Sequence, residues 1–536
     1  MREADFVTQA SLILRRGRIY TSADGQAVEA LAVRGDRVLL AGTNDAAGAL
    51  AGPETETVDL DGRTVLPGLT DAHLHLQAYA RHLGHIDCET SDLQECLERV
   101  RASAQRAAPD EWILGHGWNH NVWGTYGSAA ALDAVTGGRP TYLTAKSLHC
   151  AWANSAALAA AGVESSTADP PGGRIERDAG GRPTGILFEN ATHLVSRCIP
   201  PPTSAQVTES IAAALESLVR LGLTCVHDFD GAACLRALQL LRDDGRLSLR
   251  VVKHIQSDQL EAALDLGLRT GFGDDWLRIG HLKLFADGAL GPRTAWMLAP
   301  YDGEPDNVGM GQTSKAELVS LGRRAIPAGL ALAVHAIGDR ANREVLDAFE
   351  LLQDLEAAGP LPRAPHRIEH VQLIHPSDMP RLARLGVVAS MQPIHAPSDM
   401  LMADRYWGQR VRSAYAWRSL AAAGATLAFG SDAPVESPNP FWGLHAAVTR
   451  RRHDGSPGPD GWIPGERLSL SQALDAYTRG PARAAWPDAT RGRLASGCLA
   501  DLIILDQDPW ALDPGDLFGL CPIGTVVGGV FRHREF

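Results

Sequence analysis

The prediction of the fold begins with the stretch Leu66-Pro67-Gly68-Leu69-Thr70-Asp71-Ala72-His73-Leu74-His75-Leu76. An apolar approach ends in Pro-Gly, and the residues that follow have the pattern of a short strand. Because side chains alternate across a strand, His73 and His75 lie on one face while Leu74 and Leu76 lie on the other. Two imidazoles on one face can hold a divalent metal. An isolated pair of this kind binds a metal about as often as it is an ordinary pair of strand histidines. Residues elsewhere in the chain are needed to distinguish these two interpretations.

Short apolar segments with the pattern of strands recur along the middle of the chain, and longer helical segments separate them. They cover residues 223–228, 249–254, 278–287, 330–335, 366–371, 387–392 and 426–432. With the first strand they make about eight, the number that a (β/α)8 barrel requires. Several have an ionisable residue at the carboxyl end, which is the catalytic face of such barrels. We therefore predict an α/β protein built on a (β/α)8 TIM-like barrel.

The two ends of the chain have a different pattern. Residues 10–66 and 501–531 contain short apolar segments between Gly and Asp turns, which predicts one β-sandwich assembled from both termini. Roughly 140 residues separate the first two barrel strands, far more than a usual βα connection. We predict a composite sandwich of residues 1–66 and 488–536 and a barrel of residues 67–487. An inserted α/β domain of residues 77–220 would follow the first barrel strand and cap the barrel mouth.

The composition is that of an ordinary soluble globular protein, with 45% hydrophobic and 21% charged residues. A formal net charge of −13 argues against nucleic acid or an anionic membrane surface as partner. The charged N-terminus lacks the apolar segment of a secretory signal, and no stretch is long and apolar enough to span a bilayer. The 8 cysteines are scattered without C-x-x-C spacing, as is typical of reduced thiols, so we expect a cytoplasmic protein.

Residues that can bind metals lie at or near the ends of the predicted strands. They are His73, His75, Lys283, His335, His370 and Asp432. This set resembles the amidohydrolase superfamily of metal-dependent hydrolases, and the resemblance covers nearly the whole chain. Finer motifs resemble the amidohydrolase 3, or YtcJ-like, branch, which includes N-substituted formamide deformylases and a protein once described as an exoenzyme regulator. These motifs are Lys283-Leu284-Phe285-Ala286-Asp287-Gly288-Ala289-Leu290-Gly291, Arg293-Thr294-Ala295, His335-Ala336-Ile337-Gly338-Asp339-Arg340 and Ser431-Asp432-Ala433-Pro434-Val435.

The resemblance implies a centre of two divalent metal ions, with zinc expected. His73 and His75 would bind the more buried ion together with Asp432. His335 and His370 would bind the second ion. Imidazole and carboxylate are suitable ligands for zinc and similar ions.

Lys283 is the unusual member of this set, because an ammonium would repel both cations. In this superfamily the corresponding lysine is often carboxylated to a carbamate that bridges two metals. A buried lysine beside cations has a depressed pKa, and its neutral amine is the form that captures CO₂. The alternative is an ammonium paired with Asp287, which lies on the same strand face if the strand continues that far.

The activity that the resemblance implies is hydrolysis of a non-peptide C–N bond, such as that of an N-substituted formamide, by a metal-activated water. Asp432 would take the proton of this water and pass it to the leaving nitrogen. His149 and Arg293 are substrate contacts by resemblance only. Trp118 lies in a polar and aromatic loop of the inserted domain that suits the same role.

Other readings remain open. The same scaffold supports lactonases, cyclic amidases and deaminases, and a regulatory protein without chemistry is a further alternative. Every metal position is filled, whereas a degenerate site would be expected to have lost at least one. His227, His254 and His281 also lie in predicted strands, with a packing or supporting role at least as well founded as ligation. The expected partner is a small-molecule substrate, and a homodimer stays open.

Overall fold

The computed structural model describes residues 9–108, 111–145, 150–356, 364–485 and 490–536. The chain divides into two compact units, which are described separately. The main unit consists of Met1–Tyr79 and Val207–Phe536, and the inserted unit consists of Ala80–Gln206. The domain boundaries at 1–66 with 488–536, 67–487 and 77–220 remain a prediction.

Eight parallel strands form a barrel in the described part of the main unit, in the order β21-β20-β19-β18-β17-β16-β15-β8. They are β8 (Leu69–Leu74), β15 (Leu223–Asp228), β16 (Arg250–Gln256), β17 (Leu277–Phe285), β18 (Leu332–Ala336), β19 (Arg367–His370), β20 (Val388–Met391) and β21 (Leu427–Phe429). Neighbouring strands follow one another in the chain, so that Val226 of β15 lies opposite Asp71 of β8 and Val251 of β16. The predicted fold class is confirmed.

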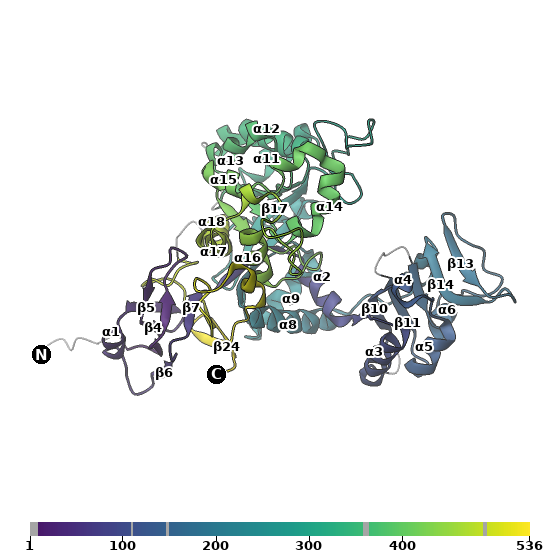
Figure 1. Ribbon diagram of the computed structural model, residues 1–536, viewed down its shortest axis with the longest axis horizontal. Helices are drawn as coiled ribbons and strands as arrows, with labels where there is room; N and C mark the ends of the chain where they lie inside the picture. Colours follow the sequence, from purple (N-terminus) through teal and green to yellow (C-terminus); the bar gives the residue numbers. More distant parts are fainter. Residues whose placement is uncertain (1–8, 109–110, 146–149, 357–363, 486–489) are drawn as a thin grey trace, which may run out of the picture. The chain divides into compact units, whose positions relative to one another are not determined.

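Helices connect the barrel strands and cover the outside of the sheet. They include α8 (Ser204–Arg220), α9 (Ala232–Asp243), α10 (Leu260–Asp265), α11 (Lys315–Ala325), α12 (Asp339–Glu356), α13 (Met379–Arg384), α14 (His395–Trp407), α15 (Trp417–Ala422), α16 (Pro440–Thr449), α17 (Leu470–Tyr477) and α18 (Arg479–Ala485). Helix α8 buries Val207, Ile211 and Leu215, a spacing that puts them on one helical face. Helix α11 begins at a capping box of Ser314 and Glu317. Figure 1 shows α11, α12 and α13 at the top of the view, above β17.

Two sheets form a sandwich from the two ends of the chain. One has the order β5-β4-β1-β6, and the other has the order β24-β23-β22-β7-β2-β3. Their strands are β1 (Leu12–Arg15), β2 (Arg18–Tyr20), β3 (Ala27–Val28), β4 (Ala30–Arg34), β5 (Arg37–Gly42), β6 (Glu56–Asp59), β7 (Thr64–Pro67), β22 (Leu502–Leu505), β23 (Gly524–Val527) and β24 (Val530–Arg534), with α1 (Asn44–Gly48) beside them. Ile503 of β22 lies opposite Leu66 of β7 in antiparallel pairing, and Figure 1 shows the yellow and purple segments together. Leu14 and Ile504 share one core cluster that spans both sheets.

A buried ion cluster joins the sandwich to the barrel. Asp501, directly before β22, accepts from Nε of Arg250 at 2.8 Å and from its Nη2 at 3.0 Å. Arg491 approaches the same carboxylate at 3.2 Å. Arg250 is the first residue of the barrel strand β16. The ion cluster therefore fixes the start of β22 against the amino end of the barrel.

The inserted unit is built around a mixed sheet in the order β13-β14-β12-β11-β10-β9. Its elements are β9 (Ile86–Asp87), α3 (Leu93–Arg106), β10 (Ile113–Trp118), α4 (His120–Trp123), α5 (Ala129–Thr136), β11 (Thr141–Ala145), β12 (Cys150–Ala153), α6 (Ser155–Ala160), β13 (Gly173–Arg177), β14 (Pro183–Glu189) and α7 (Thr192–Ser196), and α2 (Leu76–Gly84) leads into it. Trp118 and Trp152 are fully buried in its core. This is the inserted α/β element that the fold class includes.

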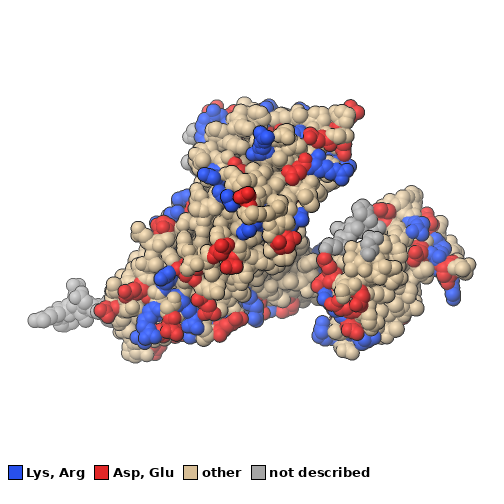
Figure 2. Space-filling view, in the orientation of Figure 1, with Lys and Arg blue, Asp and Glu red and all other residues tan. Residues whose placement is uncertain are grey.

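Charged side chains of the described residues can be followed on one face of the molecule. Basic and acidic residues are interspersed on the face shown in Figure 2. Within the described part of the chain, none of the helices combines the length and the hydropathy that crossing a membrane requires.

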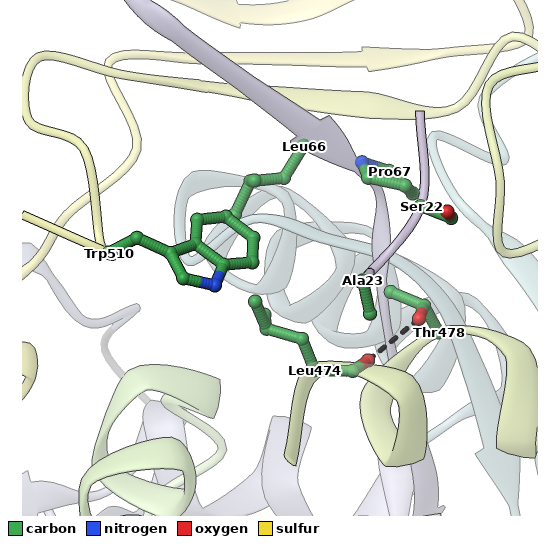
Figure 3. A pocket seen from close by; sticks show the side chains of 7 residues that line it. All are labelled: Ser22, Ala23, Leu66, Pro67, Leu474, Thr478 and Trp510. Atoms are coloured by element: carbon green, nitrogen blue, oxygen red, sulfur yellow. Dashed lines mark hydrogen bonds between the residues drawn. The ribbon is translucent and has the colours of Figure 1, made fainter. Parts of the chain in front are cut away.

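A small apolar pocket lies where the sandwich strand β7 meets α17 (Figure 3). It is lined by Ser22, Ala23, Leu66, Pro67, Leu474, Thr478 and Trp510. Thr478 donates its hydroxyl to the carbonyl of Leu474 at 2.7 Å, which leaves the lining with no free polar group from that residue. No predicted site residue lines this pocket, so it belongs to the packing of the main unit.

Candidate metal centre

The predicted metal ligands lie at the carboxyl ends of the barrel strands. Strand β8 carries His73 and ends directly before His75, β17 carries Lys283, β18 carries His335, β19 ends at His370, and Asp432 follows β21. Parallel barrel strands end on the same rim, which is why residues so distant in sequence share one site.

His73, His75 and Asp432 form one group that can hold an ion, with one ligand atom from each within 4.8 Å of the others. Oδ1 of Asp432 lies 3.5 Å from Nε2 of His73 and 3.6 Å from Nε2 of His75. Two ligands bound to zinc at about 2.1 Å in tetrahedral geometry lie about 3.4 Å apart. The spacing of these three donors therefore fits a divalent ion of this size.

The other ring nitrogen of each histidine in this group is held by a carboxylate. Nδ1 of His73 lies 2.6 Å from Oε2 of Glu369, and Nδ1 of His75 lies 3.1 Å from Oδ1 of Asp230. An ionised carboxylate only accepts hydrogen bonds, so the ring nitrogen that contacts it must carry the proton. The hydrogen-bond network therefore assigns the proton to Nδ1 and the lone pair to Nε2. Both Nε2 atoms are thus prepared to bind a metal beside Asp432.

Glu369 is in turn held by a buried arginine. Arg367 donates its Nε to Oε1 of Glu369 at 2.5 Å, and its Nη2 to Ser390 at 2.6 Å and to the carbonyl of Ala72 at 2.7 Å. Burial alone would raise the pKa of Glu369, but the charges of Arg367 and Lys283 lower it below its ordinary value. The carboxylate behind His73 therefore stays ionised.

A second group consists of His370, His395 and Asp432, again with ligand atoms within 4.8 Å of one another. Nδ1 of His370 lies 2.8 Å from Oε1 of Gln392, which leaves its Nε2 for the centre. His395 is the first residue of α14 and is 6% exposed. It is not among the six predicted ligands.

His335 joins neither of these groups in the described residues, although its ring centroid lies 4.5 Å from that of His370. Its Nε2 donates to the carbonyl of Gly288 at 2.9 Å, so Nδ1 is the nitrogen left for a ligand. For His335 to bind a second ion, a further donor atom would have to lie near its Nδ1.

Lys283 is fully buried near the histidines, and its Nζ lies 4.6 Å from the ring centroid of Phe229 and 4.8 Å from that of Phe285. Burial lowers the pKa of Lys283 to about 8. Among the described residues no hydrogen bond or ion pair holds its ammonium. Asp287 instead accepts from the backbone nitrogens of Trp296, Ile337 and Gly338 at 2.8, 3.0 and 2.8 Å. The predicted alternative of a Lys283–Asp287 pair is therefore not what the structure contains.

Burial sets the protonation of most of the imidazoles. It lowers the pKa of His73 and His370 well below the ordinary value and that of His335 to about 3. His75 differs, since burial lowers its pKa but the hydrogen bond to Asp230 and the charge of Asp432 raise it to a net increase. His73, His335 and His370 are therefore neutral, which is the form that binds metals.

The strands that carry the first group are fastened together at the seam of the barrel. Asp71 accepts from the backbone nitrogens of His73 and Ser431, at 3.0 and 3.1 Å, and from the hydroxyl of Ser431. The nitrogen of Asp432 donates to the carbonyl of His73 at 2.7 Å. A Cβ atom on Gly430 would lie 2.5 Å from the nitrogen of His73, so this close approach requires glycine. The seam thereby sets the position of Asp432, whose φ is +61°.

A third cluster, Asp228, Asp230 and Cys234, is already occupied by the chain itself. Asp228 accepts from the nitrogen of Leu76 and pairs with Lys253 at 2.9 Å. Asp230 holds His75 and two backbone nitrogens. These carboxylates support the strand that carries the first two histidines.

The predicted substrate contacts have different settings. His149 lies outside the described residues. Arg293 pairs with Glu304 at 2.7 Å and donates to the hydroxyl of Tyr406 at 3.3 Å, in the loop after β17. Trp118 donates Nε1 to the carbonyl of Leu143 within the core of the inserted unit, so packing accounts for its position. A substrate contact by any of them remains a prediction.

His227, His254 and His281 are buried in barrel strands and belong to neither group among the described residues. His227 binds Arg367 at 2.9 Å, and His254 accepts from the backbone nitrogen of His281 at 2.8 Å. Glu369, Asp230 and His395 are site residues that were not predicted from the sequence. The signal for His395 was available, because a histidine three residues past the seventh strand lies on the catalytic rim.

The chain matches known proteins over most of its length. A family model described as the amidohydrolase family matches residues 56–533. The putative amidohydrolase YtcJ of Bacillus subtilis is 33% identical, covering 90% of this chain and 91% of that protein. The N-substituted formamide deformylase of Arthrobacter pascens is 30% identical, covering 95% of each. The crystal structure of an uncharacterized metal-dependent hydrolase from Pyrococcus furiosus matches with a TM-score of 0.77 and 32% identity, covering 93% of this chain and 99% of that one. The resemblance predicted from the motifs is confirmed.

Proposed function

Because the chain belongs to the amidohydrolase family, we propose that it hydrolyses a non-peptide carbon–nitrogen bond, with N-substituted formamides as the first substrates to test. The observation that carries this proposal is the assembly of His73, His75 and Asp432 into one group of metal donors on the catalytic rim. The relative named N-substituted formamide deformylase supports the choice of bond.

The residues that would hold the metals are the six predicted ligands. His73, His75 and Asp432 would bind the first ion, and His335 and His370 would bind the second, with Lys283 between them. When bound, divalent ions such as zinc supply Lewis acidity, which lowers the pKa of water and polarises a carbonyl.

Asp432 is the proposed proton carrier. It is 9% exposed, and burial raises its pKa above the ordinary value, which makes the carboxylate a better proton acceptor. It would take a proton from the attacking water and return it to the leaving nitrogen. The hydrogen bond from its nitrogen to the carbonyl of His73 holds this carboxylate near the two histidines during both transfers.

Lys283 is proposed to be a carbamate in the active protein. Its amine is buried, makes no direct ion pair with the described side chains and has a lowered pKa, so its neutral form is accessible to CO₂. Protein loaded in ¹³C-bicarbonate should give a carbamate NMR signal that Lys283→Ala lacks. Short carboxylic acids should restore part of the activity of that variant. The absence of the signal in metal-loaded wild-type protein would refute the carbamate.

The proposed function is tested by metal analysis and a substrate panel. Protein purified without chelators should contain zinc or a similar ion and release 4-nitroaniline from 4-nitroformanilide. A chelator should abolish this release, and zinc or manganese should restore it. Turnover of only a lactone, a cyclic amide or an aminopurine would identify one of the other hydrolases. If the protein contains no bound metal and added metal does not activate it, the alternative of a regulatory protein without chemistry is favoured.

A further inference from the structure

His395 is a buried histidine that the six-residue ligand set leaves without a role. It begins α14, directly after the loop that follows the seventh barrel strand β20. One of its ring nitrogens lies within 4.8 Å of donor atoms of His370 and Asp432. Its ring is nearly parallel to that of His370, at an angle of 9° and a centroid distance of 6.4 Å. His395 therefore faces the same space as the proposed reaction.

The hydrogen bonds of His395 assign its protons. The side-chain nitrogen of Gln372 lies 3.4 Å from Nδ1 and donates to it. An imidazole that accepts at Nδ1 carries its proton on Nε2 when neutral. Among the described residues Nε2 has no hydrogen-bond partner, although the side chain is 6% exposed. A buried donor of this kind is costly unless an acceptor reaches it, so its position indicates a bound ligand atom.

We propose that His395 is a catalytic residue whose Nε2–H donates a hydrogen bond to the carbonyl oxygen of the substrate and to the oxyanion formed from it. This inference rests on the proposed amide hydrolysis. One ring nitrogen of His395 lies within 4.8 Å of donor atoms of His370 and Asp432, so the oxygen would bind close to these two residues. His395 makes no covalent bond and transfers no proton in this role. It stabilises the charge that develops on the oxygen, the most effective place for a fixed donor.

The geometry also separates this role from metal binding. A ligand nitrogen needs a free lone pair, whereas the contact with Gln372 leaves the proton on Nε2. His370 has the opposite arrangement, since the oxygen of Gln392 accepts from its Nδ1 and frees its Nε2. The two parallel rings are therefore prepared for different partners, one for a cation and one for an oxygen.

The test compares His395→Leu, which removes the donor, with His395→Gln, whose amide nitrogen can replace Nε2–H. Formate, the product of formamide hydrolysis, serves as the oxygen ligand and is titrated calorimetrically into metal-loaded protein. His395→Leu should weaken formate binding at least tenfold, and His395→Gln should restore most of it. Metal content and metal affinity should not change. His445→Leu is the matched control, because His445 is a buried histidine of α16 that packs against Phe518 and belongs to neither donor group among the described residues.

Turnover provides the second readout. His395→Leu should lower kcat for 4-nitroformanilide by about 10²-fold with little change in KM, because the donor acts most strongly on the oxyanion. Loss of metal in His395→Leu would show that His395 is a ligand and would overturn the proposal. Formate binding that is absent in wild-type protein or equal in His395→Leu would also overturn it. If formate binding depends on His395 but no amide is cleaved, the proposed function fails and the donor role stands.

Discussion

The histidines of the centre differ in what holds the ring nitrogen that points away from it. Carboxylates hold His73 and His75, whereas the amide oxygen of Gln392 holds His370 and a backbone carbonyl holds His335. A carboxylate partner makes an imidazole a stronger ligand than a neutral partner does. At the residue scale, the position formed by His73 and His75 should therefore bind its ion more tightly than the other.

Glu369 tests this difference. Glu369→Gln should weaken metal binding about tenfold, and Glu369→Leu should weaken it towards about 100-fold, because His73 loses its carboxylate. Competition with a chelating dye measures the affinity, and circular dichroism checks the fold. Glu466→Gln is the control, since Glu466 is also buried and bonded, to the nitrogen of Ser419 at 3.0 Å, but lies outside the centre. Equal affinity in both variants and wild type would contradict the role of Glu369.

Asp432 tests the proton transfer. Asp432→Asn keeps one oxygen ligand and the backbone hydrogen bond to His73 but removes the base. The fold and most of the metal should remain, while kcat should fall by roughly 10²-fold or more. Elemental analysis and steady-state kinetics on an amide that the wild type cleaves check this. Turnover close to that of the wild type would show that another group carries the proton.

The sequence predicted the candidate ligands but not the residues behind them. His73, His75 and Asp432 occur in sequence motifs that are typical of metal ligands, so these motifs are enough to predict them. Glu369 holds His73 from 296 positions away in the chain, and Asp230 holds His75 from 155 positions away. Which carboxylate reaches which imidazole depends on strand register and on distances of a few ångströms, and no local pattern contains these.

At the element scale, the seam between β8 and β21 is the feature that positions Asp432. Ser431→Ala removes the hydroxyl that donates to Asp71 and accepts from the nitrogen of Ala433 at 3.0 Å. The buried carboxylate then loses a donor, which should cost about 1–3 kcal/mol of unfolding free energy. Because Asp432 is the next residue, kcat should fall as well.

The control for this variant is Ser419→Ala, which removes a hydroxyl from the carboxylate of Glu466 away from the centre. It should lower the urea midpoint in the same way while leaving kcat unchanged. If Ser431→Ala loses stability without losing kcat, the seam supports the fold but does not position the base.

The barrel strands were predictable because each is a short apolar segment between helical segments, a pattern that local sequence contains. Predicted residues 223–228 are β15 itself, and residues 387–392 enclose β20. The setting of Trp118 was not predictable in the same way. Its indole packs against Trp123 and Trp152, a contact that depends on how the inserted unit folds as a whole.

At the scale of the whole molecule, Asp501 should make stability depend on pH. Burial alone would raise the pKa of Asp501, but the charges of Arg250 and Arg491 lower it below its ordinary value. The ion cluster therefore stabilises the fold above the unfolded pKa, about 3.9, and this contribution is lost as the pH falls through the lower folded pKa. Asp501→Asn should cost about 3–5 kcal/mol at pH 7 and progressively less in acid.

Urea unfolding at pH 7 and at a series of acidic pH values measures this effect. Asp506→Asn is the control, because Asp506 is 60% exposed in its pair with Arg63 and such surface pairs contribute at most about 1 kcal/mol. A difference between wild type and Asp501→Asn that stays constant with pH would contradict the assignment.

The pairing of β7 with β22 has a consequence for the time course of synthesis. Strand β7 leads into β8, which carries His73 and ends directly before His75, with only Gly68 between the two strands. Its hydrogen-bonding partner β22 leaves the ribosome only after the whole barrel and the inserted unit have been made. Until then one edge of β7 is unpaired, and unpaired edges are where nascent chains associate wrongly. Residues that are translated after the barrel thus protect the segment that begins the metal centre.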